Sequence, residues 1–179
     1  MRNIATTRIL HLSDPAAAND PAKPWIWPLP RLDGVSPSII PTHDPTWTDG
    51  IVQIGYTDRA ASADLVPVFA AHDGIITYAF RGERGATLCL DHPAGWSSQY
   101  DGLESVIALS TDRFRRRRKV RVRTGEVLGH VRAPLRIGFA LSRLVDGAWV
   151  PVQTAELIHA WSMLPWFAEP RAVSAAIAV

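Results

Sequence analysis

Short runs of apolar and β-branched residues, separated by turn residues, dominate the middle of the chain. Two of these runs, Val66–Ala70 and Ile75–Phe80, flank the tripeptide His72-Asp73-Gly74. An Asp-Gly pair between two such runs favours a β-hairpin, because glycine reaches positive φ without steric cost. We therefore predict that these two runs pair with each other as a hairpin at the centre of the fold.

Further runs of the same kind follow, and no long helical period separates them. The sequence predicts these strands: Ile51–Tyr56, Ala86–Asp91, Val120–Arg123, Glu126–Val131, Leu135–Leu141 and Trp149–Val152. Turns are predicted between them at Arg81–Gly85, Pro93–Gly95, Thr124-Gly125 and Asp146-Gly147. Strands that follow one another this closely are typical of an antiparallel sheet or sandwich. We therefore expect a mainly all-β fold.

The N-terminal part differs from this β-rich centre. Residues 1–23 are polar and rich in Ala, Asp and Pro, which predicts an extended arm or a tail. Pro24–Pro30 is predicted to be extended, because its prolines exclude a helix interior. Its tryptophans, Trp25 and Trp27, either cover the core, which we favour, or form an exposed aromatic contact.

A helical period occurs near the C-terminus. Leu157, Trp161 and Leu164 follow one another at spacings of four and three, which places them in one stripe of a helix. We predict a helix over Thr154–Phe167 that docks through this stripe and ends near Pro165. The expected organisation is an N-terminal arm at 1–23, a β domain at 24–152 and a helical tail at 153–179.

The composition is that of one globular domain. The 179 residues, of which 47% are hydrophobic, are enough to bury a core. No apolar run reaches the roughly 20 residues of a membrane span. The N-terminus lacks the apolar segment and cleavage site of a secretory signal, so we expect synthesis in the cytoplasm and no export by the general route. The single cysteine, Cys89, excludes an internal disulfide and is interpreted as a buried structural thiol.

The positive charge is concentrated in one segment. Arg113–Arg123 carries eight basic residues and no acid, so at a net charge of +2 overall the rest of the chain has a net charge of −6. One interpretation is that the tract binds nucleic acid or another polyanion. We favour a second, a loop that contacts acidic surface on this chain or a neighbour, because runs of charge are more often solvated faces or interaction segments. The candidate contact residues in both cases are Arg115, Arg116, Arg117, Arg118 and Lys119.

Several short motifs occur in an order that resembles the LytM or lysostaphin-type zinc endopeptidases, which cleave peptidoglycan cross-bridges. These motifs are Trp27–Pro30, Pro67–Gly74, Leu90–Trp96, Val122–Gly129 and Ile137–Leu141. They resemble the family's Trp-Pro strand, its P-V-x-A-x-x-D-G hairpin, its H-x-x-G turn, its V-x-x-G-x-x-I-G hairpin and its last strand. The resemblance covers residues 25–152 and implies an antiparallel β-sandwich of the LytM or duplicated-hybrid-motif type, with a groove across one sheet.

The same resemblance implies that the metal site is lost. The family holds zinc with the His and Asp of H-x-G-x-D and the second His of H-x-H, and the His of Y-x-H-L assists. The matching positions in this chain are Gln53 and Thr57, Arg136 and Gly138, and Gly102. Catalytic zinc needs three protein ligands, whereas the ligand positions offer an amide, a hydroxyl and no side chain, and a cation at Arg136 repels a metal ion. We expect no catalytic residue, no metal and no cofactor.

A zinc site rebuilt from other residues is the alternative. Six histidines remain, but no two of them share the i, i+2 or i, i+4 spacing that places both on one face. His92 alone matches a family position, and we expect it near the groove, hydrogen-bonded rather than catalytic. Ser98 has no evident base partner in the sequence, so a turn residue is favoured over a nucleophile.

The sequence therefore favours a non-catalytic LytM-like module that works by binding or as a structural part. A domain of this type without an export signal fits a component of a phage particle, such as a tail or baseplate part, with protein partners in the assembly. Two alternatives stay open. One is a divergent peptidoglycan endopeptidase with relocated zinc ligands, and the other is a regulator that binds peptidoglycan or an amidase through the groove.

Overall fold

The computed structural model describes Leu10, Leu12, Asp14 and residues 23–41, 50–57, 65–107, 120–164 and 172–173. Most of these residues belong to strands, which confirms the mainly all-β antiparallel fold. The candidate contact residues Arg115, Arg116, Arg117, Arg118 and Lys119 lie outside the described residues, as does most of the predicted N-terminal arm.

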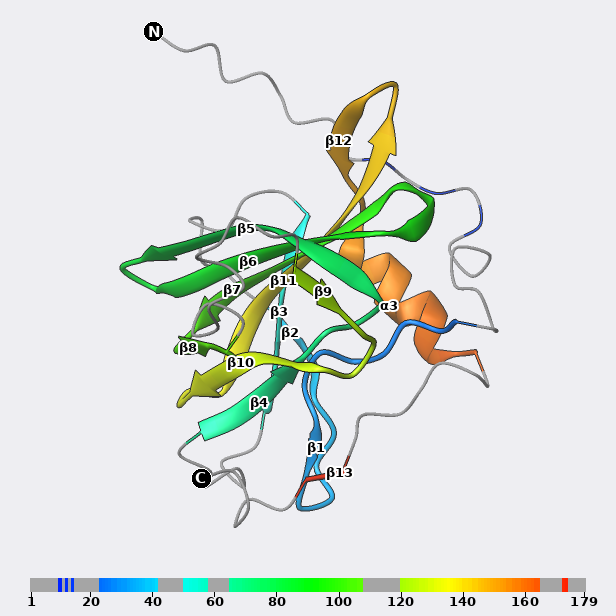
Figure 1. Ribbon diagram of the computed structural model, residues 1–179. Coiled ribbons are helices and arrows are strands. Elements are labelled where there is room, and N and C mark those ends of the chain that lie inside the picture. The colour runs from blue at the N-terminus through cyan, green and yellow to red at the C-terminus, as the bar shows by residue number, and fades with distance from the viewer. Residues whose placement is uncertain are drawn as a thin grey trace, which may run out of the picture.

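The larger of the two main sheets has eight strands, in the order β2-β3-β11-β7-β6-β5-β9, with β12 paired to β11 (Figure 1). Their bounds are β2 Ser38–Ile40, β3 Ile51–Gly55, β5 Gly74–Gly82, β6 Gly85–His92, β7 Trp96–Leu103, β9 Val120–Val122, β11 Arg136–Val145 and β12 Ala148–Pro151. All pairs in this sheet are antiparallel. The predicted turns at Arg81–Gly85, Pro93–Gly95 and Asp146-Gly147 join β5 to β6, β6 to β7 and β11 to β12.

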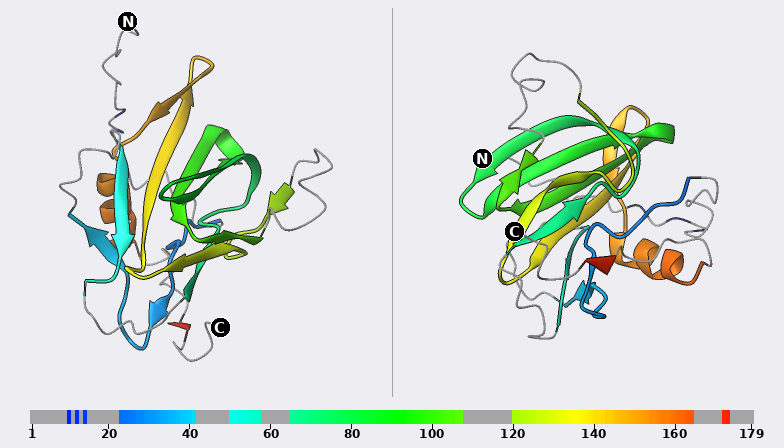
Figure 2. Two further views of the ribbon diagram at one scale, coloured as in Figure 1. Left: turned by 90° about the vertical axis from the view of Figure 1, so that its left-hand side faces the viewer. Right: turned by 60° about the horizontal axis from the view of Figure 1, so that its bottom comes forward.

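The smaller sheet has three strands in the order β4-β10-β8, and Figure 2 shows it packed beside the larger sheet. Its strands are β4 Leu65–Phe69, β8 Ser105–Val106 and β10 Val127–Arg132. Two further strands, β1 Arg31–Leu32 and β13 Ala172–Val173, form a parallel pair. The short 3-10 helix η2, Pro93–Gly95, and the helix α3, Thr154–Ser162, complete the described elements.

The predicted central hairpin is wrong. β4 pairs with β10 in the small sheet, whereas β5 pairs with β6 and β9 in the large sheet. The segment around Asp73 therefore carries the chain from one sheet to the other. The segment around Thr124, also expected as a hairpin, crosses back between β9 and β10.

The two crossovers lie side by side and hydrogen-bond to each other. The Asp73 carboxylate accepts the Thr124 backbone N–H at 2.8 Å and the Thr124 hydroxyl at 2.9 Å. The Gly125 N–H donates to the Ala70 carbonyl at 2.8 Å, and the Ala70 N–H donates to the Glu126 carbonyl at 2.9 Å. These long-range bonds replace the local pairing that an Asp-Gly turn ordinarily closes.

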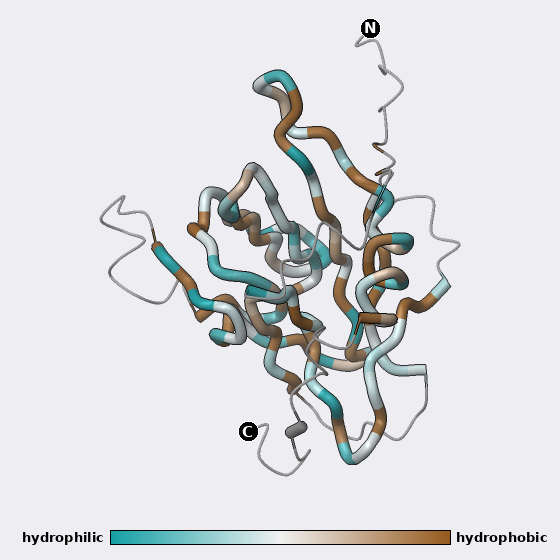
Figure 3. Tube along the Cα trace, turned by 90° about the vertical axis from the view of Figure 1, so that its right-hand side faces the viewer, coloured by the Kyte–Doolittle hydropathy of each residue, from teal (hydrophilic) through white to brown (hydrophobic). Residues whose placement is uncertain are grey.

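The core fills the space between the sheets and continues under α3. Alternate strand residues face it, and Figure 3 shows the resulting alternation of apolar and polar positions along the strands. The helix begins at Thr154 as predicted, and Leu157 and Trp161 of its stripe are buried. It ends at Ser162, earlier than the predicted Phe167, and Leu164 of the same stripe is partly buried against the core.

Trp25 confirms the favoured interpretation of the N-terminal tryptophans. Its side chain is 3% exposed and packs against four aromatic rings of the core. The ring centroids lie at 4.9 Å from His72, 4.8 Å from His92, 6.1 Å from Trp96 and 5.4 Å from Trp161. The segment before β1 is thereby fixed to the C-terminal helix through one stacked pair, Trp25 on Trp161.

Candidate functional site

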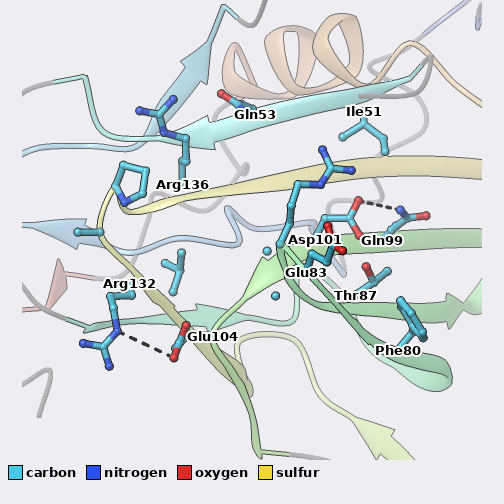
Figure 4. A pocket seen from close by; sticks show the side chains of 17 residues that line it. Ile51, Gln53, Phe80, Glu83, Thr87, Gln99, Asp101, Glu104, Arg132 and Arg136 are labelled. Carbon is cyan, nitrogen blue, oxygen red and sulfur yellow. Dashed lines mark hydrogen bonds and ion pairs between the residues drawn. The ribbon is translucent and has the colours of Figure 1, made fainter. Parts of the chain in front are cut away.

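A cavity of about 1190 Å³ opens on the outer face of the large sheet (Figure 4). Strand β11 runs through it, with β3 on one side and β7 and β6 on the other. The polar and charged side chains that line it are Gln53, Glu83, Arg84, Thr87, Gln99, Asp101, Glu104, Arg132 and Arg136. Two of the matched sequence positions, Gln53 and Arg136, are among these side chains.

The strand register brings three of the residues into one row. Gly138 on β11 lies directly opposite Gln53 on β3 and Asp101 on β7. Residues directly opposite each other in antiparallel strands share a face of the sheet, so Gln53 and Asp101 flank the position where Gly138 has no side chain. Adjacent strands are about 4.8 Å apart, which places the two backbones on either side of Gly138 about 10 Å from each other.

The other matched positions divide into two groups. Arg136 and Gly102 line the cavity with Gln53. Thr57, beyond the end of β3, is exposed and does not line it. Three of the five positions thus line the cavity, Gly138 is buried in the row between Gln53 and Asp101, and Thr57 lies outside.

The Gln53 side chain is buried, and none of the described residues forms a hydrogen bond with it. It is 8% exposed, lines the cavity, and its amide makes no hydrogen bond within the described part of the chain. A buried amide offers two donors and two acceptor lone pairs, and native proteins satisfy nearly all such groups. Gln53 is therefore a polar group that lines the cavity and is not satisfied by any described residue.

Asp101 and Arg136 supply opposite charges in the same cavity. The Gln99 side-chain amide donates to the Asp101 carboxylate at 2.8 Å, which fixes the carboxylate next to Gly138 (Figure 4). Arg136 is exposed, and no described residue forms an ion pair or hydrogen bond with its guanidinium. Among the described residues, the groove thus presents a cation and an amide without partners, together with an oriented carboxylate.

The chemistry of this donor set does not fit a catalytic zinc ion. Zinc in proteins is bound by Cys, His and carboxylate groups in tetrahedral geometry. Across the described residues, no three His, Cys, Asp or Glu side chains converge as metal ligands. At the row through Gly138 the structure offers one carboxylate, Asp101, one amide, Gln53, and the Arg136 cation nearby. These side chains do not form a zinc-binding set. Polarisation of a carbonyl or activation of a water by zinc therefore cannot be derived from this row.

His92 lies in the protein interior and does not line the cavity, contrary to the expected place near the groove. Its Nδ1 lies 2.8 Å from the Asp73 carbonyl, and its Nε2 lies 2.6 Å from the Ser98 hydroxyl. A carbonyl only accepts, so Nδ1 carries the proton and Nε2 accepts the Ser98 O–H. Burial lowers the pKa of His92 to about 4, so the ring is neutral at pH 7.

This pair gives Ser98 the base partner that sequence reasoning missed. The arrangement resembles the start of a nucleophilic dyad, but the Ser98 side chain is 1% exposed and no substrate reaches its oxygen. The Tyr100 hydroxyl next to it accepts the Ala71 N–H at 2.8 Å. The network therefore satisfies polar groups that are buried in the core.

Cys89 faces the groove side of β6 rather than the core. It is partly buried and pairs across the sheet with Gln99, whose side-chain oxygen lies 4.0 Å from its sulfur. Burial, with the charges of Asp101 and Asp91, raises the pKa of the Cys89 thiol to about 11. The thiol is therefore protonated at neutral pH and is a weak nucleophile.

Two residues of the site, Gln99 and Asp101, were missed by motif comparison. The informative pattern is the alternation within β7, where Trp96, Ser98 and Tyr100 are buried. In a strand the intervening side chains point to the opposite face, which places Gln99 and Asp101 on the groove side. Farther along the cavity, Arg132 and Glu104 form an exposed pair at 4.0 Å, a type that contributes little stability.

Comparisons with known proteins show the fold. No protein-family model and no curated protein matches the chain. A structure from Ruminococcus gnavus, named as a glycyl-glycine endopeptidase LytM, matches with a TM-score of 0.57 at 14% identity, over 83% of this chain and 62% of that one. The chain thus spans less than two thirds of the length of this similar structure.

Two further structures are similar at lower scores. The SpoIIQ–SpoIIIAH pore-forming complex matches with a TM-score of 0.48 at 14% identity, over 72% of this chain and 88% of that one. Lysostaphin matches with a TM-score of 0.45 at 14% identity, over 71% and 50%. The chain has a LytM-like fold, which confirms the resemblance in the sequence motifs. Within the described residues, no helix is both long and apolar enough to cross a membrane.

Proposed function

We propose that this chain is a non-catalytic binding module with a LytM-like fold, which holds an extended peptide in its groove and works within a larger assembly. The observation that carries the proposal is the row through Gly138. Where the resemblance implies zinc ligands, the chain has the Gln53 amide and the bare backbone of Gly138, with the Arg136 cation beside them. A groove with these groups binds through hydrogen bonds and charge and lacks a means to activate water.

Zinc analysis combined with a digestion assay tests the absence of catalysis. After incubation with excess zinc and removal of free metal, we expect less than one tenth of a zinc ion per chain and no release of soluble fragments from peptidoglycan sacculi. A lysostaphin-type enzyme in parallel serves as the positive control. Stoichiometric zinc together with fragment release would establish the divergent endopeptidase in place of the binding module.

Binding to sacculi tests whether the peptide belongs to peptidoglycan. We expect the wild-type chain to sediment with intact sacculi. The Arg136→Gln variant is expected to stay in the supernatant. A chain that stays in the supernatant at all sacculus concentrations would restrict the groove to peptides of protein partners. Arg121→Gln is a suitable control, because Arg121 is exposed on β9 and does not line the cavity.

We propose a phage tail or baseplate as the assembly by analogy of fold, and the charge distribution supports contacts between subunits. The basic tract within 113–123 and a remainder of net charge −6 suit contacts between neighbouring subunits. We expect the chain to co-purify with protein partners in a particle much larger than the monomer. Co-purification with nucleic acid alone, lost steeply as salt is raised, would favour the polyanion interpretation of the tract.

A further inference from the structure

We propose that the groove binds the carboxyl-terminal end of a peptide, with the terminal carboxylate on Arg136 and the last peptide unit on Gln53. This inference rests on the proposed peptide-binding function and specifies which part of the peptide is recognised. It starts from Gln53, whose amide is more than nine-tenths buried, lines the cavity and has no partner in the described part of the chain.

The Gln53 amide is complementary to a peptide unit. Its carbonyl oxygen accepts one N–H, and its NH₂ group donates to one carbonyl, so a single glutamine can satisfy both polar groups of one peptide bond. Leaving a buried amide unsatisfied costs about 1–3 kcal/mol. A ligand that makes both bonds recovers this free energy, whereas a ligand with only acceptors leaves the Gln53 oxygen without a donor.

Arg136 supplies the anchor for the carboxylate. It lies two residues before Gly138 on β11, which puts both on the same face of the strand, and it lines the cavity with Gln53. Because none of the described residues pairs with its guanidinium, the planar N–H fork is available. Arginine binds carboxylates through two parallel hydrogen bonds, a geometry that favours a free peptide end over an internal carbonyl.

Asp101 extends the site in the other direction. It lines the cavity on β7, across the buried Gly138 from Gln53, which lines the cavity on β3. The Gln99 amide already holds one side of the Asp101 carboxylate, which leaves acceptor positions for an N–H of the ligand. The row spans about 10 Å, which matches about three residues of extended peptide at roughly 3.3 Å per residue.

The charges around the cavity favour a peptide end over a nucleic acid. The lining side chains include three bases, Arg84, Arg132 and Arg136, and three acids, Glu83, Asp101 and Glu104. A polyanion would meet the three carboxylates, whereas a peptide end brings one carboxylate and several N–H donors. The balance of charge and the separation of Arg136 from Asp101 therefore match a ligand with one negative end and hydrogen-bond donors behind it.

A pair of simple peptides tests this inference. Tetra-alanine and its C-terminal carboxamide differ in the terminal charge while sharing every other group. Each is titrated into the ¹⁵N-labelled full chain, and the side-chain NH₂ signals of Gln53 and Gln99 are followed by NMR. We expect the free acid to shift the Gln53 signals and to bind at least about tenfold more tightly than the carboxamide, as a lost charged hydrogen-bond pair implies.

Two variants separate the terminal anchor from general peptide binding. Arg136→Gln is expected to abolish the preference for the free acid, while Arg121→Gln keeps it. Equal binding of both peptides to the wild-type chain would overturn carboxylate recognition and leave the peptide-binding groove in place. If neither peptide shifts Gln53 and the chain also fails to bind sacculi, the proposed function and this inference are both rejected.

Discussion

The stability of the fold depends on pH through His92, which contacts the crossover at Asp73 and Ser98 on β7. Its ring is neutral inside the fold, held by the Asp73 carbonyl and the Ser98 hydroxyl. Burial lowers its pKa from the ordinary 6.5 to about 4, so the unfolded chain takes up the proton first as the pH falls. The fold therefore keeps this contribution to stability above pH 6.5 and loses it between pH 6.5 and 4.

We expect the free energy of unfolding to fall by up to about 3 kcal/mol between pH 7 and pH 4, since one pKa unit corresponds to about 1.4 kcal/mol. Urea denaturation at a series of pH values measures it. The His92→Gln variant should be less stable than the wild type at pH 7, but its free energy of unfolding should change little between pH 6.5 and 4. His130→Gln, on β10 outside this network, should keep the wild-type slope. If the free energy of unfolding of the His92 variant falls with pH as steeply as that of the wild type, His92 is not the source of the pH dependence.

At the scale of elements, Gly129 sets how closely the strands of the small sheet approach. It lies on β10 between β8 and β4, opposite Val106 and Val68. A Cβ added to it would lie 1.9 Å from the Ser105 carbonyl oxygen, which belongs to the backbone and cannot rotate away. The β8–β10 pair, next to the rim of the cavity, therefore depends on glycine at this position.

Gly129→Ala is expected to lower the free energy of unfolding by about 1–3 kcal/mol, because the backbones must separate. Gly82→Ala is the matched control. A Cβ there would meet the ring of Phe80 at 3.1 Å, and that side chain is 55% exposed and free to move. We expect this control to change stability by less than about 0.5 kcal/mol. Chemical denaturation compares the two, and equal effects would contradict the close approach.

The alternation of residues was sufficient to predict most of the strands, but it did not predict which strands pair. Local sequence around Asp73-Gly74 looks the same whether the chain turns back on itself or crosses to another sheet. The choice is made by residues far away in the sequence, because Asp73 is satisfied by Thr124 and Ala70 by Gly125 and Glu126. Turn chemistry specifies a change of direction and not the partner of each strand.

The residues of the site were also predicted only in part. Motif order placed Gln53, Arg136 and Gly138 around one groove, because it carries information on the whole fold. Asp101 was missed, although it precedes the matched Gly102, since it matches no family ligand. His92 was expected near the groove because motif matching gives a position in a strand and does not tell which face it occupies.

At the scale of the whole molecule, α3 is part of the main core. Leu157, Ile158 and Trp161 are each less than 5% exposed, and Trp161 stacks on Trp25 with the rings inclined by 24°. The first and last described strands, β1 and β13, also pair with each other. The β domain and the helix therefore share one hydrophobic core.

A chain that ends at Val152 is expected to be largely unfolded. Burial of each large apolar side chain contributes about 1.5–3 kcal/mol, so losing three of them removes an amount comparable with the roughly 5–15 kcal/mol that stabilises a typical domain. A chain that ends at Leu164 keeps the helix and should unfold cooperatively. Circular dichroism melting curves distinguish them, and a cooperative transition in the shorter chain would show that the strands fold without α3.

The paired crossovers also set the order in which the protein can be completed during synthesis. β4, at Leu65–Phe69, leaves the ribosome long before its partner β10, at Val127–Arg132, has been made. β3, at Ile51–Gly55, can pair with the preceding β2, but its second partner, β11, begins only at Arg136. The nascent chain therefore carries apolar strands that lack a partner until β10 and β11 have been made, and folding is a late, concerted event that depends on protection from aggregation in the meantime.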